Sequence, residues 1–165
     1  MAKIHSERMT AQIEGDFVVF LIGMRINKWW KVGKWAPSAM AMSRMLKELG
    51  NLPKEDTGFL GATNFGIAGM VQYWRSFDAL EAYASADNRE HRPAWAAFNK
   101  RMRDAREDVG IWHETYLIRA GEYESVYSGM PPFGLGRAAD LVPATGSRGS
   151  ARARLRGDAD AVKAE

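Results

Sequence analysis

Residues 72–95, QYWRSFDALEAYASADNREHRPAW, decide the fold of this chain because a strand pattern passes directly into a helix pattern. Residues 71–74 predict a strand. Ser76 then supplies a typical helix N-cap, and apolar residues follow it at helical spacing, at Phe77, Leu80 and Tyr83. The rest of the chain provides the elements against which this strand-helix unit packs.

Elements on both sides of this unit complete the pattern of a small α+β domain. Residues 17–26, FVVFLIGMRI, form a near-continuous apolar run that predicts a central strand buried on both faces. A helix is expected over residues 35–49, with Pro37 in its first turn. The apolar face of this helix is formed by Met42, Met45, Leu46 and Leu49. Further strands are expected at residues 59–65, 70–74 and 111–118, and a further helix from residue 93.

The order of these elements is strand, helix, strand, strand, helix pair and strand, which is the β-α-β-β-α-β order of a ferredoxin-like domain. Such a domain has an antiparallel sheet with helices on one face only. A sheet with strands this apolar must cover its other face, and we expect two copies of the chain to pair through it. The predicted fold is therefore α+β, ferredoxin-like, assembled as a homodimeric α+β barrel with a cavity between sheet and helices in each subunit.

Composition divides the chain into one domain and two flanking segments. At 165 residues the chain is long enough for a single continuous core. We expect a ferredoxin-like domain at residues 16–137 and a flexible N-terminal arm at residues 1–15. Residues 138–165 contain few large apolar side chains, so we expect a disordered tail there.

Charge and cysteine content exclude several classes of protein. The chain has no cysteine, which excludes disulfides and thiol nucleophiles and fits a reducing compartment. Residues 137–165 contribute +2 of the net charge of +3, and a nearly neutral body argues against a nucleic-acid partner. The longest apolar run, residues 17–24, is too short to span a bilayer. We therefore expect a cytoplasmic protein that binds neither nucleic acid nor membrane.

Several separate motifs resemble one family in their sequence order. They are QYWRSFDALEAY, HRPAWAAFN, GIWHETY, GEYESVY and MPPFGLG. Together they resemble the DUF4188 family, whose members are monooxygenase-like and related to the antibiotic biosynthesis monooxygenases of the dimeric α+β barrel superfamily. The resemblance covers residues 15–137. It implies an oxidoreductase that acts on a hydrophobic small molecule of secondary-metabolite type.

The same superfamily contains haem enzymes, and one of their patterns can be followed residue by residue. Haem-degrading members carry W-x-S, an aromatic residue, S-D and a His across this strand-helix unit. Trp74 and Ser76 match its start, Tyr83 matches the aromatic residue over the haem, and His91 falls at the iron ligand. His91 lies two residues closer to Tyr83 than in the family pattern, and Met24 stands near the position of a required Asn. The resemblance leaves haem as an optional cofactor, with His91 as the candidate ligand of its iron.

His113 is a candidate catalytic base. Period-two alternation in IWHETY places His113 on one face of its strand, and Trp112, Glu114 and Tyr116 on the other. A His that lines a cavity can act as a general base, with Tyr116 as the partner of the substrate anion. Glu114 can take the same role from the opposite face. The alternative interpretation of His113 is a structural residue in a dimer interface.

Aromatic residues near the sheet suit a flat organic ligand. Trp74 and Trp112 are candidate contacts to the substrate, and Arg75, directly after a strand, is a candidate for binding a carboxylate. Core packing and a surface ion pair are the alternative roles of these side chains.

Together with the resemblance, these observations predict a monooxygenase-like enzyme that either requires no cofactor or uses haem. In the cofactor-free relatives that the resemblance implies, a deprotonated substrate itself reduces oxygen, and the protein supplies a base, a dry cavity and a stabilised anion. Two alternatives remain open. One is a haem enzyme with His91 as iron ligand and dehydratase-like or oxidative chemistry, and the other is a non-catalytic module that binds a small molecule.

Overall fold

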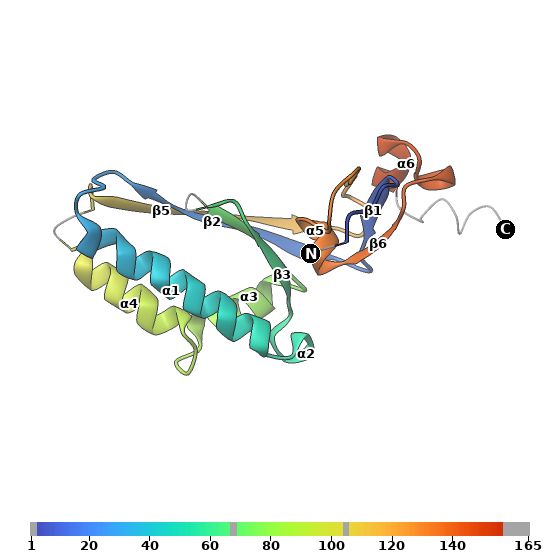
Figure 1. Ribbon diagram of the computed structural model, residues 1–165. Coiled ribbons are helices and arrows are strands. Elements are labelled where there is room, and N and C mark those ends of the chain that lie inside the picture. The colour runs from blue at the N-terminus through green and yellow to red at the C-terminus, as the bar shows by residue number, and fades with distance from the viewer. Residues whose placement is uncertain (1–2, 67–68, 104–105, 157–165) are drawn as a thin grey trace.

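The structure is a computed structural model that describes residues 3–66, 69–103 and 106–156 of the chain. Its centre is an antiparallel sheet with the strand order β3-β4-β2-β5. These strands are β2 (Phe17–Ile26), β3 (Phe59–Asn64), β4 (Gly69–Trp74) and β5 (Val109–Ile118). Three helices, α1 (Val32–Asn51), α3 (Phe77–Ser85) and α4 (His91–Arg101), lie on one face of the sheet (Figure 1). A short helix, α2 (Lys54–Thr57), joins α1 to β3.

This strand order and the one-sided helices are those of the ferredoxin-like fold, so the predicted α+β class and element order are confirmed. The four strands form an open sheet, and within the described residues the chain closes no barrel by itself. No helix in the described ranges is both long enough and apolar enough to cross a membrane.

β2 occupies the centre of the sheet, as its apolar sequence predicts. It pairs with β4 along one edge and over its full length with β5 along the other. Val18 and Phe20 face the helices, while Phe17 and Val19 face away from them. Residues 19–24 are only partly buried, so the expected burial of the whole strand on both faces is wrong. The reason is that a cavity lies under this part of β2 and its other face is only partly covered.

The helices differ from expectation mainly at their starts. α1 begins at Val32 rather than at residue 35, so Pro37 lies inside the helix and not in its first turn. No side-chain hydrogen bond caps this start, which explains why no capping residue marks it in the sequence. α3 begins as predicted, because Ser76 Oγ accepts a hydrogen bond of 3.1 Å from the Ala79 N–H.

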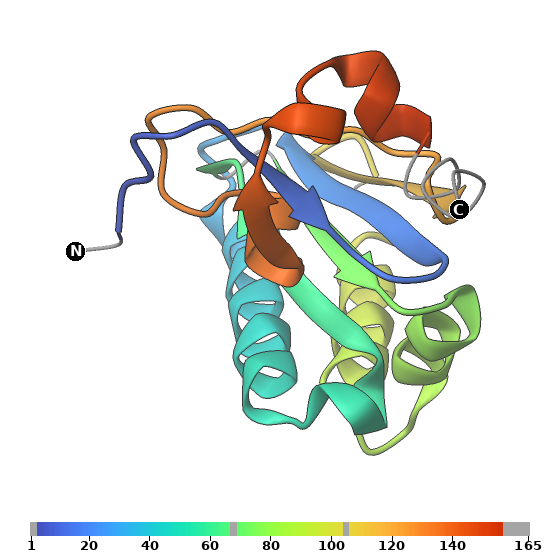
Figure 2. The ribbon, with the colours of Figure 1, turned by 90° about the vertical axis from the view of Figure 1, so that its right-hand side faces the viewer.

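The two ends of the chain form a second small sheet that covers part of the open face of the first. β1 (Met9–Gln12) pairs antiparallel with β6 (Asp140–Pro143), and Figure 2 shows the two strands side by side. We call β1, β6, α5 (Leu135–Ala138), the 3-10 helix η2 (Gly146–Arg148) and α6 (Ala151–Arg156) the terminal unit. It shares a buried cluster with the large sheet, formed by Met9, Ala11, Phe17, Val71, Tyr73, Tyr127 and Leu135.

The terminal unit corrects two expectations. Residues 9–12 are a paired and largely buried strand, so the N-terminal segment is not a flexible arm throughout. Residues 138–156 are not disordered, because β6 is paired with β1 and Leu141 packs against the buried cluster. Each of these short strands finds its partner at the opposite end of the chain, which no local pattern reveals. Residues 157–165 of the expected tail lie outside the described residues.

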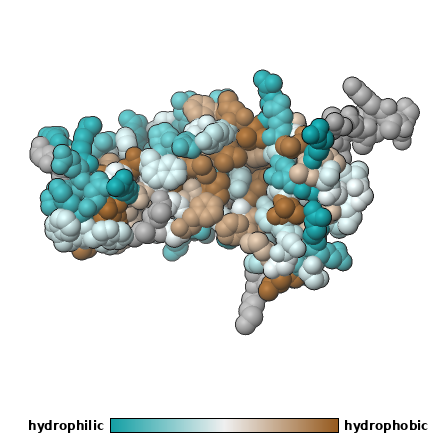
Figure 3. All heavy atoms as spheres, turned by 90° about the horizontal axis from the view of Figure 1, so that it is seen from above, coloured by the Kyte–Doolittle hydropathy of each residue, from teal (hydrophilic) through white to brown (hydrophobic). Residues whose placement is uncertain are grey.

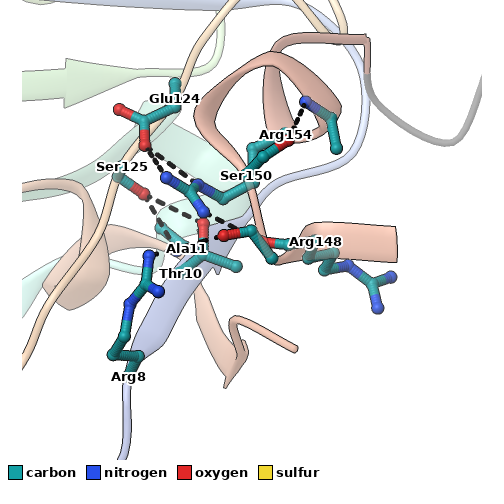
Figure 4. Close-up of polar contacts among 10 residues, drawn as sticks. Arg8, Thr10, Ala11, Glu124, Ser125, Arg148, Ser150 and Arg154 are labelled. Atoms are coloured by element: carbon teal, nitrogen blue, oxygen red, sulfur yellow. Dashed lines mark hydrogen bonds and ion pairs between the residues drawn. The ribbon is translucent and has the colours of Figure 1, made fainter. Parts of the chain in front are cut away.

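A polar cluster holds α6 in the terminal unit (Figure 4). The Arg154 side chain is only 5% exposed and forms an ion pair with Glu124, to which its Nε donates at 2.9 Å. Its Nη1 also donates to the carbonyl of Arg148 at 2.9 Å. On the other side of the same segment, Ser125 Oγ accepts a hydrogen bond of 3.0 Å from the Ala11 N–H. Residues 124 and 125 therefore join β1 to α6.

Beyond the terminal unit, the face of the sheet that is turned away from the helices is open to solvent. Figure 3 views this side, and apolar side chains gather over its middle. β5 contributes Trp112 and Tyr116 to this face, 43% and 48% exposed. The Trp112 indole lies against paired glycines, since a Cβ on Gly69 would stand 3.3 Å from its Cζ2 and Trp112 pairs with Gly23. The prediction of an uncovered second face thus holds for one part of the sheet only.

Candidate functional site

A cavity of about 250 Å³ lies between α1 and the face of the large sheet that the helices cover. Met42 and Leu46 reach it from the same side of α1 that supplies the core residues Met45 and Leu49. We call it the α1 cavity, and its apolar walls are Ile22, Met24, Met42, Leu46, Met70 and Ile111. These side chains come from four separate elements, so no local sequence motif could have predicted the cavity.

The chemistry of the walls points to an uncharged ligand. None of the described side chains that line the α1 cavity carries a formal charge, and a buried charge without a partner is costly. Three of the walls are thioethers, from Met24, Met42 and Met70. Methionine side chains are flexible and make favourable contacts with aromatic rings. The cavity therefore suits a neutral, apolar ligand and can adapt to the shape of a ring.

Two neutral polar side chains contribute to the walls from opposite elements. Ser38, on α1, accepts a hydrogen bond of 3.3 Å from Nη2 of Arg101, and its own hydroxyl hydrogen has no acceptor within the described part of the chain. Asn64, the last residue of β3, also has a carboxamide without a partner there. A hydroxyl that accepts from a guanidinium becomes a better donor. Ser38 and Asn64 can therefore donate hydrogen bonds to an oxygen of the ligand.

His113 lies beside the α1 cavity but not in its wall. It pairs with Ile22 across β2 and stands two residues from Ile111, and both of these side chains line the cavity. It therefore shares the face of the sheet on which the cavity lies. Its ring centre is 5.6 Å from that of Phe20, and the residue is exposed. Its position is adjacent to the cavity, at its solvent edge.

Glu114 and Tyr116 lie on the opposite face of the sheet from His113, as the alternation predicts. The Tyr116 hydroxyl donates to Glu114 Oε2 at 2.6 Å, and this hydrogen bond raises the pKa of Tyr116. A tyrosine whose pKa is raised is a poor source of phenolate at neutral pH. The sheet itself separates this pair and Trp112 from the α1 cavity, so the three residues do not share one site with His113.

Trp74 and Arg75 do not line the α1 cavity either. Trp74 is fully buried, and its indole N–H donates to Gln72 Oε1 at 3.0 Å. The Arg75 side chain instead closes a turn, since its Nη1 donates to the carbonyl of Glu14 at 2.7 Å. Core packing and a local surface contact are thus the roles that the structure gives them.

The residues around His91 do not fit a haem. Nδ1 of His91 is 2.8 Å from the carbonyl oxygen of Ala84. Tyr83, expected to lie over the porphyrin, is 7% exposed and donates from its hydroxyl to Glu48 Oε2 at 2.8 Å. Burial and this contact with Glu48 raise the pKa of Tyr83. His91 lines neither the α1 cavity nor a second cavity that lies beside α3, so it is not placed to ligate the iron of a haem held in either.

Several residues of the candidate site were missed at the level of sequence. Ser38 and Asn64 have no motif around them, and Met42 was assigned to the core with Met45. Met24 was singled out only for standing near the position of a family Asn, and it lines the cavity. Among the described residues, no group of three His, Asp or Glu side chains is arranged to hold a metal ion.

Comparison with known proteins finds one family model and two similar chains. A family model described as monooxygenase af470-like matches residues 17–135. Monooxygenase af470 from Aspergillus fumigatus is 28% identical over 159 residues, covering 83% of this chain and 56% of that protein. The chain thus spans just over half the length of this relative. A dimeric protein of unknown function with a ferredoxin-like fold, from Bacteroides fragilis, matches 62% of this chain and 96% of its own at 14% identity and a TM-score of 0.33.

Proposed function

Because this chain belongs to the monooxygenase af470-like family, we propose that it is a monooxygenase-like enzyme that oxidises a hydrophobic small molecule in the α1 cavity. The observation that carries the proposal is the composition of that cavity, whose apolar walls hold two neutral side chains, Ser38 and Asn64, with hydrogen-bond donors that no described residue accepts. Every residue that lines it falls within the stretch that matches the family. The activity of the longer fungal relative enters only as part of this proposal.

We assign the base to His113. Its place beside Ile22 and Ile111 allows its imidazole to reach a ligand that extends from the cavity toward β5. The most acidic C–H of a neutral apolar compound is one adjacent to a carbonyl group, and a positioned imidazole is the usual side chain to remove such a proton. The exposed position of His113 lets the proton pass on to solvent.

Ser38 and Asn64 would hold the oxygen of the resulting enolate. Removal of the proton shifts negative charge from carbon to the carbonyl oxygen, and donors that are already aimed at this oxygen stabilise the charge. The Arg101 guanidinium, which donates a hydrogen bond to Ser38, adds a positive charge directly behind the cavity wall. The apolar remainder of the cavity would limit the access of water to a bound ligand and so strengthen these interactions.

The oxidation balances without an external reductant. The electron-rich carbon of the enolate donates electrons to dioxygen, and a bond forms between this carbon and one oxygen atom. At a methylene carbon, two C–H bonds break and one C=O bond forms. The second oxygen atom leaves as water with the two hydrogens. The substrate thereby supplies all the electrons, and the protein supplies position, base and anion stabilisation.

The second part of the proposal is a homodimer that forms through the open face of the sheet. Trp112 and Tyr116 expose aromatic surface there, next to the partly buried apolar residues Val19 and Leu21 of β2. Aromatic residues are enriched in protein interfaces. The terminal unit covers only one part of this face, which leaves room for a second copy.

The proposal is tested with anthrone, a neutral tricyclic ketone with an acidic methylene group, and isotopically labelled dioxygen. We expect one labelled oxygen atom in the product and one equivalent of water.

His113→Gln should slow turnover by roughly a hundredfold or more, the usual contribution of a general base. His91→Gln is the matched control and should leave turnover unchanged, because His91 lies away from the cavity. If His91→Gln abolishes turnover and His113→Gln does not, the assignment is wrong. Saturable binding without any oxidation would identify a binding module instead.

A further inference from the structure

The connection between β2 and α1 exposes large apolar side chains, two of them aromatic. Residues 28–32 read KWWKV, and Trp29, Trp30 and Val32 are 55%, 75% and 52% exposed. Figure 1 shows that this connection lies at one end of the molecule, together with the end of α4 and the start of β5. We call residues 27–34, 100–103 and 106–108 the basic tip.

The basic tip also concentrates positive charge. Its described residues carry seven cations and two carboxylates, and Asp104 adds one further carboxylate in the sequence. The net charge of this end is therefore +4, against +3 for the whole chain. The cations are Lys28, Lys31, Lys34, Lys100, Arg101, Arg103 and Arg106. A net charge of +4 is thus concentrated where the tryptophans are exposed, while the rest of the chain carries −1.

The tip is held in place by specific contacts rather than left as a loose loop. Lys28 and Lys31 each form an ion pair of 2.8 Å with the buried Asp108. The carbonyl of Trp29 accepts a hydrogen bond of 3.0 Å from the indole of Trp35, and the two rings pack edge to face at 5.8 Å. These contacts fix the backbone on both sides of Trp30 and leave its indole directed to solvent.

A tryptophan surrounded by lysine and arginine fits one partner surface well. Indole rings settle at the level of the lipid headgroups, and clusters of cations are attracted to anionic lipids by about 1 kcal/mol per charge. The α1 cavity begins close to the same end, since Met24 stands near the end of β2 and Ser38 lies in the first half of α1. An apolar ligand of that cavity would partition into lipid.

We propose that the basic tip binds the surface of an anionic lipid bilayer and brings the mouth of the α1 cavity to the membrane. The expectation of no membrane partner rested on the absence of a spanning segment, and surface binding does not need one. The docking itself stands on the charge and exposure of the tip. Only the link between membrane and substrate rests on the proposed function.

Vesicle binding tests the docking without any assay of activity. The full chain is mixed with phosphatidylcholine vesicles that contain or lack phosphatidylserine, at low and high salt. We expect binding only to the anionic vesicles, weakened by salt. Quenching of tryptophan fluorescence by brominated lipid should fall in Trp30→Ala and persist in Trp95→Ala, an exposed tryptophan on α4 outside the tip.

A matched pair of charge variants decides whether the tip is responsible. Replacement of Lys100, Arg103 and Arg106 by Gln removes three exposed cations of the tip. It should weaken vesicle binding by roughly a hundredfold, at about fivefold per charge. Replacement of Lys47, Lys54 and Arg152 by Gln removes the same charge from exposed positions elsewhere and should have a much smaller effect.

Several outcomes would overturn the inference. Equal binding by the two charge variants, equal binding to vesicles with and without phosphatidylserine, or no binding at low salt would each exclude it. Binding of a single-stranded oligonucleotide that depends on the tip and excludes vesicles would identify nucleic acid as its partner. Because none of these results involves turnover of anthrone, the docking and the proposed enzyme activity can fail separately.

Discussion

Asp108 is a single carboxylate that fixes the start of β5 to the connection after β2. Its side chain is 2% exposed and receives hydrogen bonds of 2.8 Å from both Lys28 and Lys31. These hydrogen bonds hold the pKa of Asp108 below its ordinary value of 3.8. A carboxyl whose pKa is lowered by folding stabilises the fold above its unfolded pKa, and this contribution is lost as the pH falls through the folded value.

Asp108→Asn should therefore lower the free energy of unfolding at neutral pH, because two lysines lose their counter-charge beside a buried side chain. It should also flatten the decline of stability with acid below pH 3.8. Urea unfolding across this pH range measures both effects. Glu107→Gln changes an exposed neighbouring carboxylate and is expected to alter neither. An unchanged acid limb in Asp108→Asn would refute the linkage.

Two serines of α1 line the cavity, but only one of them has a hydroxyl hydrogen available to the ligand. Both Ser38 and Ser43 line the α1 cavity, but the Ser43 hydroxyl already donates to the carbonyl of Ala39 at 3.3 Å. Ser38 instead accepts from Arg101 and keeps its own hydrogen for the ligand. Ser38→Ala should slow turnover of anthrone by roughly a hundredfold, the usual cost of one oxyanion donor. Ser43→Ala should leave turnover nearly unchanged, and equal effects in steady-state kinetics would remove Ser38 from the mechanism.

At the scale of elements, α1 serves the core and the cavity from one helix face. Leu49 is 3% exposed in the cluster around Trp74, while Met42 lines the cavity. Leu49→Ala should cost about 2–5 kcal/mol of stability, because it leaves a void in a packed cluster. Met42→Ala enlarges a cavity that already exists, so its cost in urea unfolding should be clearly smaller. It should change the affinity for anthrone, whereas Leu49→Ala should not.

Elements with a continuous local signal were predicted well, and elements that depend on distant partners were not. The apolar run of residues 17–26 gave β2 its exact bounds, and Ser76 marked the start of α3. β1 and β6 are four residues each and become strands only through their pairing with each other. The start of α1 lacks a capping side chain and was placed too late. A strand that is stabilised mainly by pairing with a distant segment has no local sequence pattern from which it could be predicted.

The candidate site was predictable only in outline. A cavity between sheet and helices was expected from the fold, and the alternation in β5 placed His113 on the same face as Ile111, which lines the α1 cavity. Trp74 was expected to contact substrate but is buried, because Gln72 two residues earlier on the same face satisfies its indole N–H. Asn64 and Ser38 meet across a space that arises only when β3 and α1 are brought together.

At the scale of the whole molecule, the open face of the sheet governs assembly. Trp112→Glu places a charge at the centre of the proposed dimer interface, and the loss of a central aromatic contact commonly costs about 2 kcal/mol or more of binding free energy. The dimer should therefore dissociate at protein concentrations roughly thirtyfold higher than for the wild type. Analytical ultracentrifugation measures this shift, with Trp95→Glu on α4 as control. A wild-type protein that stays monomeric at every concentration would end the proposal of a homodimer.

The paired glycines under Trp112 have a consequence for how ligand and partner influence each other. Gly23 and Gly69 line the α1 cavity on one side of the sheet, and Trp112 lies against them on the other. Without side chains at these two positions, only the thickness of the backbone separates the ligand from the aromatic surface offered to a second copy. Ligand binding on one side of the sheet should therefore change the affinity for a second copy on the other side. Thermodynamic reciprocity requires that dimerisation change the ligand affinity by the same factor. If ligand tightens the dimer by some factor, dimerisation tightens ligand binding by the same factor, which would make ligand affinity depend on protein concentration.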